Sequence, residues 1–333
     1  MQPWSHKFAN QSSKVKQVNG KSTNWLFVVF AISIASLNSL QARVNAELGF
    51  RTGDGLLSAF LSISSGFVIL IIAVLTIPTA RKGLAMIPSL LREKKLAWWH
   101  LLGGASGAYY AIAQTTTGIL LGVALFSVAI VSGQTLSSAL ADRYGLGPSG
   151  IHKLTTPRIL GTVLVLIAVI VSVAGQLNAS FSVWVALVPF LAGFAMGLQL
   201  AVNGRVRKES GSVAASTFIN FGVATVLLTL IVLVKSIFQP LPESLPPELW
   251  LYTGGVLGSI FIAGSAFVVA RIGVLVLGVS VVAGQLLGAT VIDLLAPSPL
   301  HPLTLSTVAG VVLALIAVAI SSTSWQKKKR IAD

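Results

Sequence analysis

Residues 122–142 read GVALFSVAIVSGQTLSSALAD, and residues 273–293 read GVLVLGVSVVAGQLLGATVID. The two stretches align without a gap, 151 residues apart, and carry the same residue at eight of 21 positions. This agreement exceeds chance even in a chain rich in Val, Leu, Ala and Gly. Both stretches are apolar, contain a Gly-Gln pair and end in Asp. The recurrence indicates an internal duplication, which is the first feature to establish in a new sequence.

The composition indicates a membrane protein. Of 333 residues, 54% are hydrophobic and 10% are charged, whereas a soluble domain has about 25% charged residues. The net charge of +14 would suit a nucleic-acid ligand, but the basic residues lie in short runs between apolar segments. We therefore expect no nucleic-acid partner, and we expect the basic runs to contact anionic membrane lipid.

No motif points to an enzyme. The chain has no cysteine, which excludes disulfide and thiol chemistry, and its four histidines are scattered rather than spaced as metal ligands. Neither a Walker A motif nor a G-x-S-x-G motif occurs. We expect no enzyme activity, no cofactor and no metal site.

Ten segments are long enough to span a bilayer, since a spanning helix needs about 20 mostly apolar residues. They are residues 25–44, 55–78, 98–117, 119–141, 158–176, 182–202, 212–236, 250–270, 272–294 and 303–322. Only Thr117-Gly118 separates the third from the fourth, and only the residues around Gly273 separate the eighth from the ninth, so each pair predicts a tight helical hairpin. The Pro-rich segment 238–249 predicts a loop. The predicted fold class is an all-α membrane protein with ten transmembrane helices.

Lysine and arginine predict the orientation, because they are enriched in cytoplasmic loops. With the N-terminus in the cytoplasm, 20 of the 23 basic residues fall on the cytoplasmic side, and only Arg43, Arg51 and Lys235 fall outside. The N-terminal stretch is polar and basic, without the apolar core of a cleaved signal peptide. We expect a multi-pass protein of the inner or plasma membrane with both termini cytoplasmic.

The duplication covers the whole chain. The end of the first span, Gln41 to Asn45, recurs 158 residues later as Gln199 to Asn203, and a Gly-Gly-x-x-Gly opening recurs at 103–107 and 254–258. In the second and seventh spans, we match Gly66 with Gly222. The predicted organisation is a basic tail at 1–24, a five-span repeat at 25–176, a linker at 177–181, a second five-span repeat at 182–322, and a basic tail at 323–333.

Each half has five spans, and this odd number predicts that the second half enters the membrane from the opposite side. The halves are then inverted copies around a central cavity, related by a pseudo-two-fold axis in the membrane plane. Inverted repeats are a common plan of secondary transporters, whose halves rock to open a central site to either side. Asp142 and Asp293 are then expected at opposite faces of the membrane.

Two inverted halves of five spans resemble the drug/metabolite transporter superfamily. Within it, the Leu-Gln-x-x-Val-Asn end of span one, the Gly-Gly-x-x-Gly opening of span three and the Gly-Gln pair of span four are similar to the YdcZ-type family of inner-membrane exporters. The resemblance covers about residues 25–322. It implies a ten-helix bundle whose cavity is lined by spans one to four and six to nine, with spans five and ten at the periphery. Many family members are a single half, and this chain resembles a fused pair.

Polar side chains inside apolar spans are the candidates for solute binding, because a buried amide is costly unless it is paired. Each candidate either lines the cavity or makes a hydrogen bond that fixes helix packing, and both interpretations stay open. The glycines that precede two of the glutamines favour packing, and helix C-capping is a further alternative for the asparagines. The candidate substrate-binding residues are Gln134, Gln285, Gln41, Gln199, Asn45, Asn203 and Tyr110.

The carboxylates nearest the membrane are Glu47, Asp54, Asp142 and Asp293, and all of them lie at span ends. Proton-coupled transporters usually bury a carboxylate at mid-membrane, and no predicted span has one at its centre. This pattern disfavours proton antiport through a buried carboxylate, and it disfavours Mg²⁺ or a polycation as the solute. We expect Asp142 to form an interfacial ion pair with Arg143.

The sequence thus predicts a secondary transporter that moves a small organic solute by alternating access, with export as the direction that the family resemblance implies. An uncoupled facilitator is one alternative and fits the missing central carboxylate. A non-transporting membrane scaffold is another, but it leaves the recurrence of polar residues in both halves unexplained. The expected partners are a small-molecule solute and membrane lipid, and a homodimer stays open.

Overall fold

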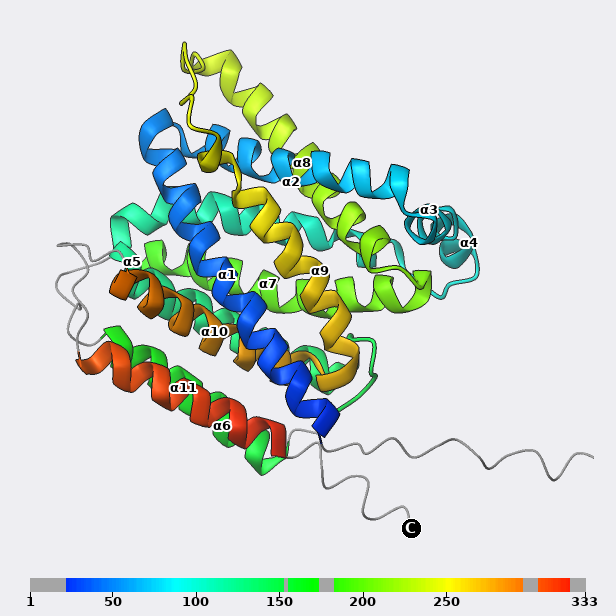
Figure 1. Ribbon diagram of the computed structural model, residues 1–333, viewed down its shortest axis with the longest axis vertical. Coiled ribbons are helices and arrows are strands. Elements are labelled where there is room, and N and C mark those ends of the chain that lie inside the picture. The colour runs from blue at the N-terminus through cyan, green and yellow to red at the C-terminus, as the bar shows by residue number, and fades with distance from the viewer. Residues whose placement is uncertain (1–21, 153–154, 174–182, 296–304, 324–333) are drawn as a thin grey trace, which may run out of the picture.

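The computed structural model describes residues 22–152, 155–173, 183–295 and 305–323, and every regular element in these ranges is a helix (Figure 1). The long helices are α1 (Ser22–Thr52), α2 (Gly55–Thr76), α5 (Gly103–Tyr144), α6 (Thr156–Val173), α7 (Val183–Ser210), α8 (Val213–Phe238), α9 (Gly254–Ile272), α10 (Val274–Leu295) and α11 (Leu305–Thr323). The short ones are α3 (Pro78–Ala85), α4 (Ile87–Arg92), η1 (Trp98–Leu102) and η3 (Leu249–Tyr252). The predicted linker at 177–181 and nearly all of the two predicted tails lie outside the described residues.

The described helices have the length and surface of membrane spans. Six segments are long and apolar enough to cross a bilayer: Trp25–Thr52, Gly55–Thr76, Leu187–Ser210, Val213–Phe238, Leu249–Ile272 and Val274–Ile292. The outward faces of α2 and α8 carry exposed large apolar side chains, such as Ile72 at 56% and Leu230 at 54% exposure. Many such side chains along whole helices mark a surface that contacts lipid rather than water. The chain is therefore an all-helical, multi-pass membrane protein.

Helix α5 has 42 residues, and a straight helix of that length would extend about 63 Å, twice the hydrocarbon thickness of a bilayer. Its first part runs antiparallel to α7. Gly103 lies against Asn203, and the Tyr109 hydroxyl donates to the Val188 carbonyl oxygen at 3.2 Å. As α5 advances, its contacts therefore move backward along α7.

The second part of α5 runs parallel to α7. Ile130 lies against Gly193, and Ser137 lies against Gly197. Both parts of α5 thus contact α7, in opposite directions, so α5 reverses between Tyr109 and Ile130. The predicted reversal is present, but the predicted break at Thr117-Gly118 is not, because the backbone is helical throughout Gly103–Tyr144.

Between α9 and α10 the reversal takes place at a single residue. Gly273 has φ +81°, a conformation that side chains other than glycine rarely adopt, and its N–H still donates to the Val269 carbonyl oxygen at 2.9 Å. Helix α10 begins at the next residue. The predicted hairpin at Gly273 is confirmed.

Two close helix crossings depend on glycine. A Cβ on Gly133 of α5 would overlap the Phe190 main-chain oxygen of α7, and a Cβ on Gly284 of α10 would overlap the Ile32 main-chain oxygen of α1. The glycines are 151 residues apart and their partners are 158 residues apart, which are the two spacings found in the sequence. The same crossing therefore occurs twice, once with α7 and once with α1.

Glycines in α5 and α9 correct one detail of the sequence alignment. Gly104 of α5 lies against Asn220 and Ala224 of α8, and Gly255 of α9 lies against the main chain of Ser62 and Gly66 of α2. The counterpart of Gly66 is thus Ala224, 158 residues later. The match of Gly66 with Gly222 was wrong. It paired two glycines that lie in similar apolar sequence but at positions that do not correspond in the structure.

The basic segment between α2 and α5 folds into α3, α4 and η1, which the hydropathy pattern did not predict. Pro78 and Pro88 lie in the first turns of α3 and α4, where proline costs no helical hydrogen bond. Ile87, Leu90 and Leu96 pack there in a small cluster with a residue of α7. Residues 239–248 contain no helix, as predicted for the Pro-rich loop.

Asp142 does not pair with Arg143, which corrects the expected ion pair. Its carboxylate instead accepts from Arg158 of α6 at 2.8 Å, and both side chains are at most 3% exposed. It also accepts from the backbone N–H groups of Val274 at 2.9 Å and Leu275 at 3.2 Å. Asp142 therefore caps the N-terminus of α10 from the end of α5, where a carboxylate is favoured by the helix dipole.

Candidate functional site

A cavity of about 50 Å³ lies between α1, α2, α5, α7, α8 and α9. A water molecule takes up about 30 Å³ in the liquid, so this space accommodates little more than water and an organic solute requires it to widen. Figure 1 shows α1 and α9 crossing in front of α5 and α7, with α6 and α11 at one side of the bundle. No residue of the described lining comes from α6, α10 or α11.

Four of the candidate residues line the cavity: Gln41 and Asn45 from α1, Gln199 from α7, and Tyr110 from α5. This geometry fits the expectation that the glutamines late in spans one and six, and a tyrosine of span three, line the cavity. Their role in binding a solute stays a prediction.

Asn203 does not line the cavity. Its Oδ1 accepts from Asn220 Nδ2 of α8 at 3.2 Å, and its main-chain oxygen accepts from Ser216 Oγ at 2.8 Å. Asn203 is therefore not a C-cap, since α7 continues to Ser210. It ties α7 to α8 beside the cavity-lining Asn220.

Gln134 and Gln285 also lie outside the cavity lining. Gln134 is 2% exposed, and its main-chain oxygen lies beside Gly197 of α7. The Gln285 main-chain oxygen accepts from Ser39 Oγ of α1 at 2.7 Å. Each glutamine follows the glycine at a close helix crossing, so the structure places the two Gly-Gln pairs in helix contacts rather than in the cavity.

Most of the lining consists of residues that correspond in the two halves of the sequence, at spacings of 158 residues for α1, α2, α7 and α8 and of 151 for α5 and α9. The corresponding pairs are Asn38 with Met196, Gln41 with Gln199, Ser62 with Asn220, Ile63 with Phe221, Gly107 with Gly258, Tyr110 with Phe261, and Ala111 with Ile262. The cavity therefore lies where the two halves meet.

Three polar lining residues were not predicted: Asn38, Ser62 and Asn220. Asn38 precedes Gln41 by three residues and Asn45 by seven, so all three share one face of α1, and that spacing could have revealed it. Ser62 shares a helix face with Ser58, and Asn220 shares one with Ser216. The two polar pairs correspond at the 158-residue spacing, and that recurrence could have revealed them.

The electrostatic character of the cavity is neutral and polar. None of the described lining residues is charged. Three buried oxygens at its wall, Asn45 Oδ1, Ser62 Oγ and Gln199 Oε1, have no hydrogen-bond partner in the protein. Buried polar groups are nearly always paired, and exceptions call for an explanation.

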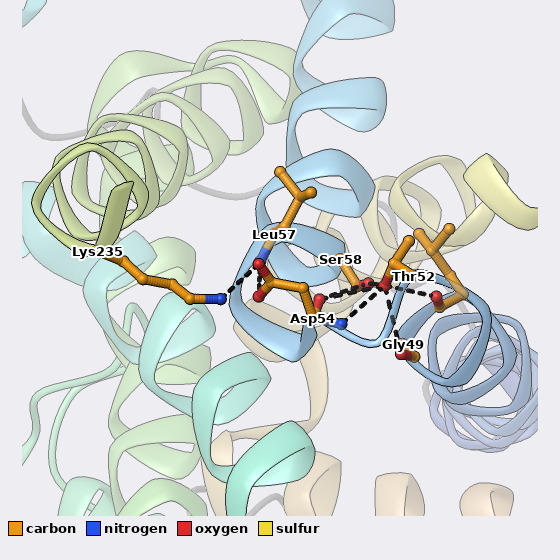
Figure 2. A network of polar contacts seen from close by, with 7 residues as sticks. Gly49, Thr52, Asp54, Leu57, Ser58 and Lys235 are labelled. Atoms are coloured by element: carbon orange, nitrogen blue, oxygen red, sulfur yellow. Dashed lines mark hydrogen bonds and ion pairs between the residues drawn. The ribbon is translucent and has the colours of Figure 1, made fainter. Parts of the chain in front are cut away.

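At the end of the bundle where α1 meets α2, a polar network joins the two halves (Figure 2). Asp54 caps α2 by accepting from the Leu57 N–H at 3.1 Å, and it forms an ion pair with Lys235 of α8. Thr52 Oγ1 lies 2.7 Å from Ser58 Oγ and accepts from the Asp54 N–H at 3.3 Å. This end is therefore held by a charge pair as well as by hydroxyl groups.

The pKa of Asp54 lies below its ordinary value. Burial has the largest single effect and raises the pKa, but the hydrogen bond and charge of Lys235, together with the N–H groups of Leu57 and Leu56, outweigh it. Asp54 is thus ionised when it pairs with Lys235.

The opposite end, where α7 meets α8, repeats this arrangement without charge. Ser212 Oγ caps α8 by accepting from the Ala215 N–H at 3.1 Å, and the Ser212 N–H donates to Ser210 Oγ at 3.4 Å. Ser210 and Ser212 follow Thr52 and Asp54 by 158 residues. The two ends share one capping geometry, and of the residues Thr52, Asp54, Ser210 and Ser212 only Asp54 forms an ion pair.

A multi-pass helical bundle with a polar cavity at its centre is typical of membrane transport proteins. A family model described as "Putative inner membrane exporter, YdcZ" matches residues 26–171 and 184–320. The chain belongs to this YdcZ family of inner membrane exporters, and the predicted family is confirmed.

A solved crystal structure is similar to this chain with a TM-score of 0.63. It shares 16% sequence identity, and the match covers 92% of this chain and 99% of that one. At this identity the likeness shows the fold alone. A search of curated proteins finds no match.

Proposed function

We propose that this protein is a secondary transporter that moves a small organic solute outward by alternating access. The observation that carries the proposal is the cavity, whose walls are built from corresponding residues of the two halves. If the halves rock about this shared site, the same residues face one side of the membrane and then the other. The small cavity volume fits a state that must open to admit solute.

The proposal includes ten spans in two inverted repeats, residues 25–176 and 182–322. The repeated Gly133 and Gly284 crossings, the paired cavity residues and the two stretches matched by the family model support this arrangement. α5 would supply two spans, because its two parts run along α7 in opposite directions. The protein would act without enzyme activity.

We place both termini in the cytoplasm, in agreement with the distribution of lysine and arginine. The α1–α2 end, with Asp54 and Lys235, then faces outward, and the α7–α8 end, with Ser210 and Ser212, faces the cytoplasm. In this proposal the Asp54–Lys235 pair, which joins α2 to α8, holds the outer end closed and separates when that end opens.

An uncoupled facilitator is a second candidate for the same site. It is favoured by the lining, which includes no carboxylate among the described residues. A carboxylate within the cavity would be the expected proton site of an antiporter. Flux that does not change between about pH 5 and 8 would support the facilitator, because no described lining residue titrates in that range.

Thiol accessibility tests alternating access directly, since the chain has no native cysteine. Ala42→Cys places one thiol in the cavity wall. We expect a membrane-impermeant thiol reagent to modify it in both right-side-out and inside-out vesicles. Ala168→Cys, at a fully buried α6 position outside the cavity, is the control and should resist modification from both sides.

Modification of Ala42→Cys from one side alone, or from neither, would contradict alternating access. A proteoliposome flux assay with a panel of radiolabelled solutes completes the test. Absence of flux for every solute, combined with one-sided labelling, would favour the membrane scaffold instead.

A further inference from the structure

We infer that the cavity selects an uncharged amphipathic solute that carries N–H or O–H donors, and that Asn45 and Ser62 receive the donor end. This inference rests on the proposed transport function and specifies the substrate class. It follows from which lining atoms lack partners, which charges are absent, and where the aromatic rings lie.

The unpartnered atoms are all oxygens. Asn45 Oδ1 and Gln199 Oε1 are amide oxygens that accept hydrogen bonds, and Ser62 Oγ accepts as well as donates. Ser62 and Gln199 are each 1% exposed, so bulk water does not satisfy them. A ligand that presents donors would pair them.

Comparison with the other half shows that Asn45 and Ser62 differ from their counterparts in hydrogen bonding. Asn203 Oδ1, the counterpart of Asn45, already accepts from Asn220. Ser62 occupies the position that corresponds to Asn220, but its side chain has no N–H to offer. Asn45 Oδ1 and Ser62 Oγ both lie against Gly254 of α9, so the two oxygens are close together, yet neither has a hydrogen-bond partner.

The absence of charge on the described lining disfavours ionic solutes. A charged group moved into an enclosed cavity loses its hydration, and only an opposite charge compensates for that loss. Asp54 and Lys235, outside the described lining, already neutralise each other. Neither cations nor anions therefore find a partner in the wall.

Aromatic rings supply the apolar part of the site. Tyr110, Phe221 and Phe261 line the cavity from α5, α8 and α9. Rings of this kind bind flat or branched apolar groups by contact area. A solute with a donor at one end and an apolar body would fill both parts of the cavity.

The test uses three probes of one shape that differ in charge: benzamide, benzoate and benzamidinium. We expect benzamide to bind the full-length protein in detergent at least ten-fold more tightly than either ion, as measured by calorimetry and by ligand-induced thermal shift. Equal or tighter binding of an ion would overturn the inference and leave the transport proposal intact.

The variants locate the donor end. Asn45→Ala combined with Ser62→Ala should weaken benzamide binding by about ten-fold, because two charge-free hydrogen bonds are lost. Ser64→Ala removes another buried hydroxyl without a partner from the same helix, outside the lining, and should bind benzamide as the wild type does. Unchanged thermal stability confirms that each variant is folded.

Equal benzamide affinity in the double variant and the wild type would contradict the placement of the donor end. If benzamide does not bind while other solutes are transported, the inferred class is wrong and the proposed function stands. If no probe binds and no solute is transported, both fail.

Discussion

The two ends of the bundle are built on one plan and differ in charge. At the α1–α2 end, Thr52 and Asp54 make the turn and the helix cap, and Lys235 neutralises the aspartate. At the α7–α8 end, Ser210 and Ser212 make the same turn and the same cap by hydroxyl groups. The capping geometry therefore needs only an oxygen acceptor at this position.

The charge at the α1–α2 end adds a link between helices. A serine cap joins neighbouring residues of one chain segment, whereas the Asp54–Lys235 pair also joins α2 to α8, which belong to different halves of the sequence. In the proposed mechanism this pair would help hold the outer end closed. The serine end has no described equivalent of the pair and would separate at lower cost.

The largest effect is expected from Lys235→Met. The substitution leaves the Asp54 carboxylate, which is 6% exposed, without its counter-charge. We expect a loss of about 3 kcal/mol in the free energy of unfolding, as is typical when one partner of a buried pair is removed. Equilibrium unfolding in mixed micelles measures it.

The matched control combines Lys235→Met with Asp54→Ser, which makes this end similar to the serine end. It should regain most of the lost stability, because a serine cap replaces the buried charge. A double variant as unstable as Lys235→Met alone would show that the loss comes from packing rather than from charge.

A smaller effect is expected from Ser212→Ala, which removes the cap of α8. The loss should be about 1 kcal/mol, the usual cost of an N-cap substitution. Ser89→Ala, an exposed serine that bonds to the Met86 carbonyl oxygen, is the control and should change stability by less than about 0.5 kcal/mol. A loss at Ser212 as large as at Lys235 would remove the distinction between the two ends.

The smallest effect is the pH dependence of the charged end, since burial opposes the lowering of the Asp54 pKa. A lowered pKa in the folded state stabilises the protein fully above the unfolded-state value of 3.8, and that stabilisation declines as the pH falls through the folded-state pKa. Wild-type stability should therefore fall more steeply below about pH 4 than that of Asp54→Ser. Parallel curves for the two proteins would contradict the ionised pair.

The positions of the helices could be predicted well from sequence, because a run of about 20 apolar residues has few alternatives. The described helices coincide with the predicted spans to within a few residues, apart from the longer ends of α1 and α7 and the unbroken backbone of α5. The short helices α3 and α4 escaped prediction, because six to eight residues carry too little periodicity and their helicity depends on packing.

The site was harder to predict. The sequence indicates that a polar residue within a span is buried, but it does not indicate whether the residue faces the cavity or a neighbouring helix. Gln41 and Gln199 reach the cavity, whereas Gln134 and Gln285 lie at glycine crossings. The ion pair of Asp142 with Arg143 could have been rejected, since adjacent side chains on a helix do not face each other. Its true partner, Arg158, lies on the next helix.

Alternating access is tested by two distance measurements, made by double electron–electron resonance on spin-labelled cysteines introduced into the cysteine-free chain. One label pair, Phe50→Cys with Leu249→Cys, reports on the α1–α2 end. The corresponding pair, Trp98→Cys with Lys208→Cys, reports on the α7–α8 end. All four positions are exposed. Alternating access predicts that solute shifts the two distances in opposite directions, one end widening as the other narrows. Distances that stay constant at both ends, or that widen together, would contradict it.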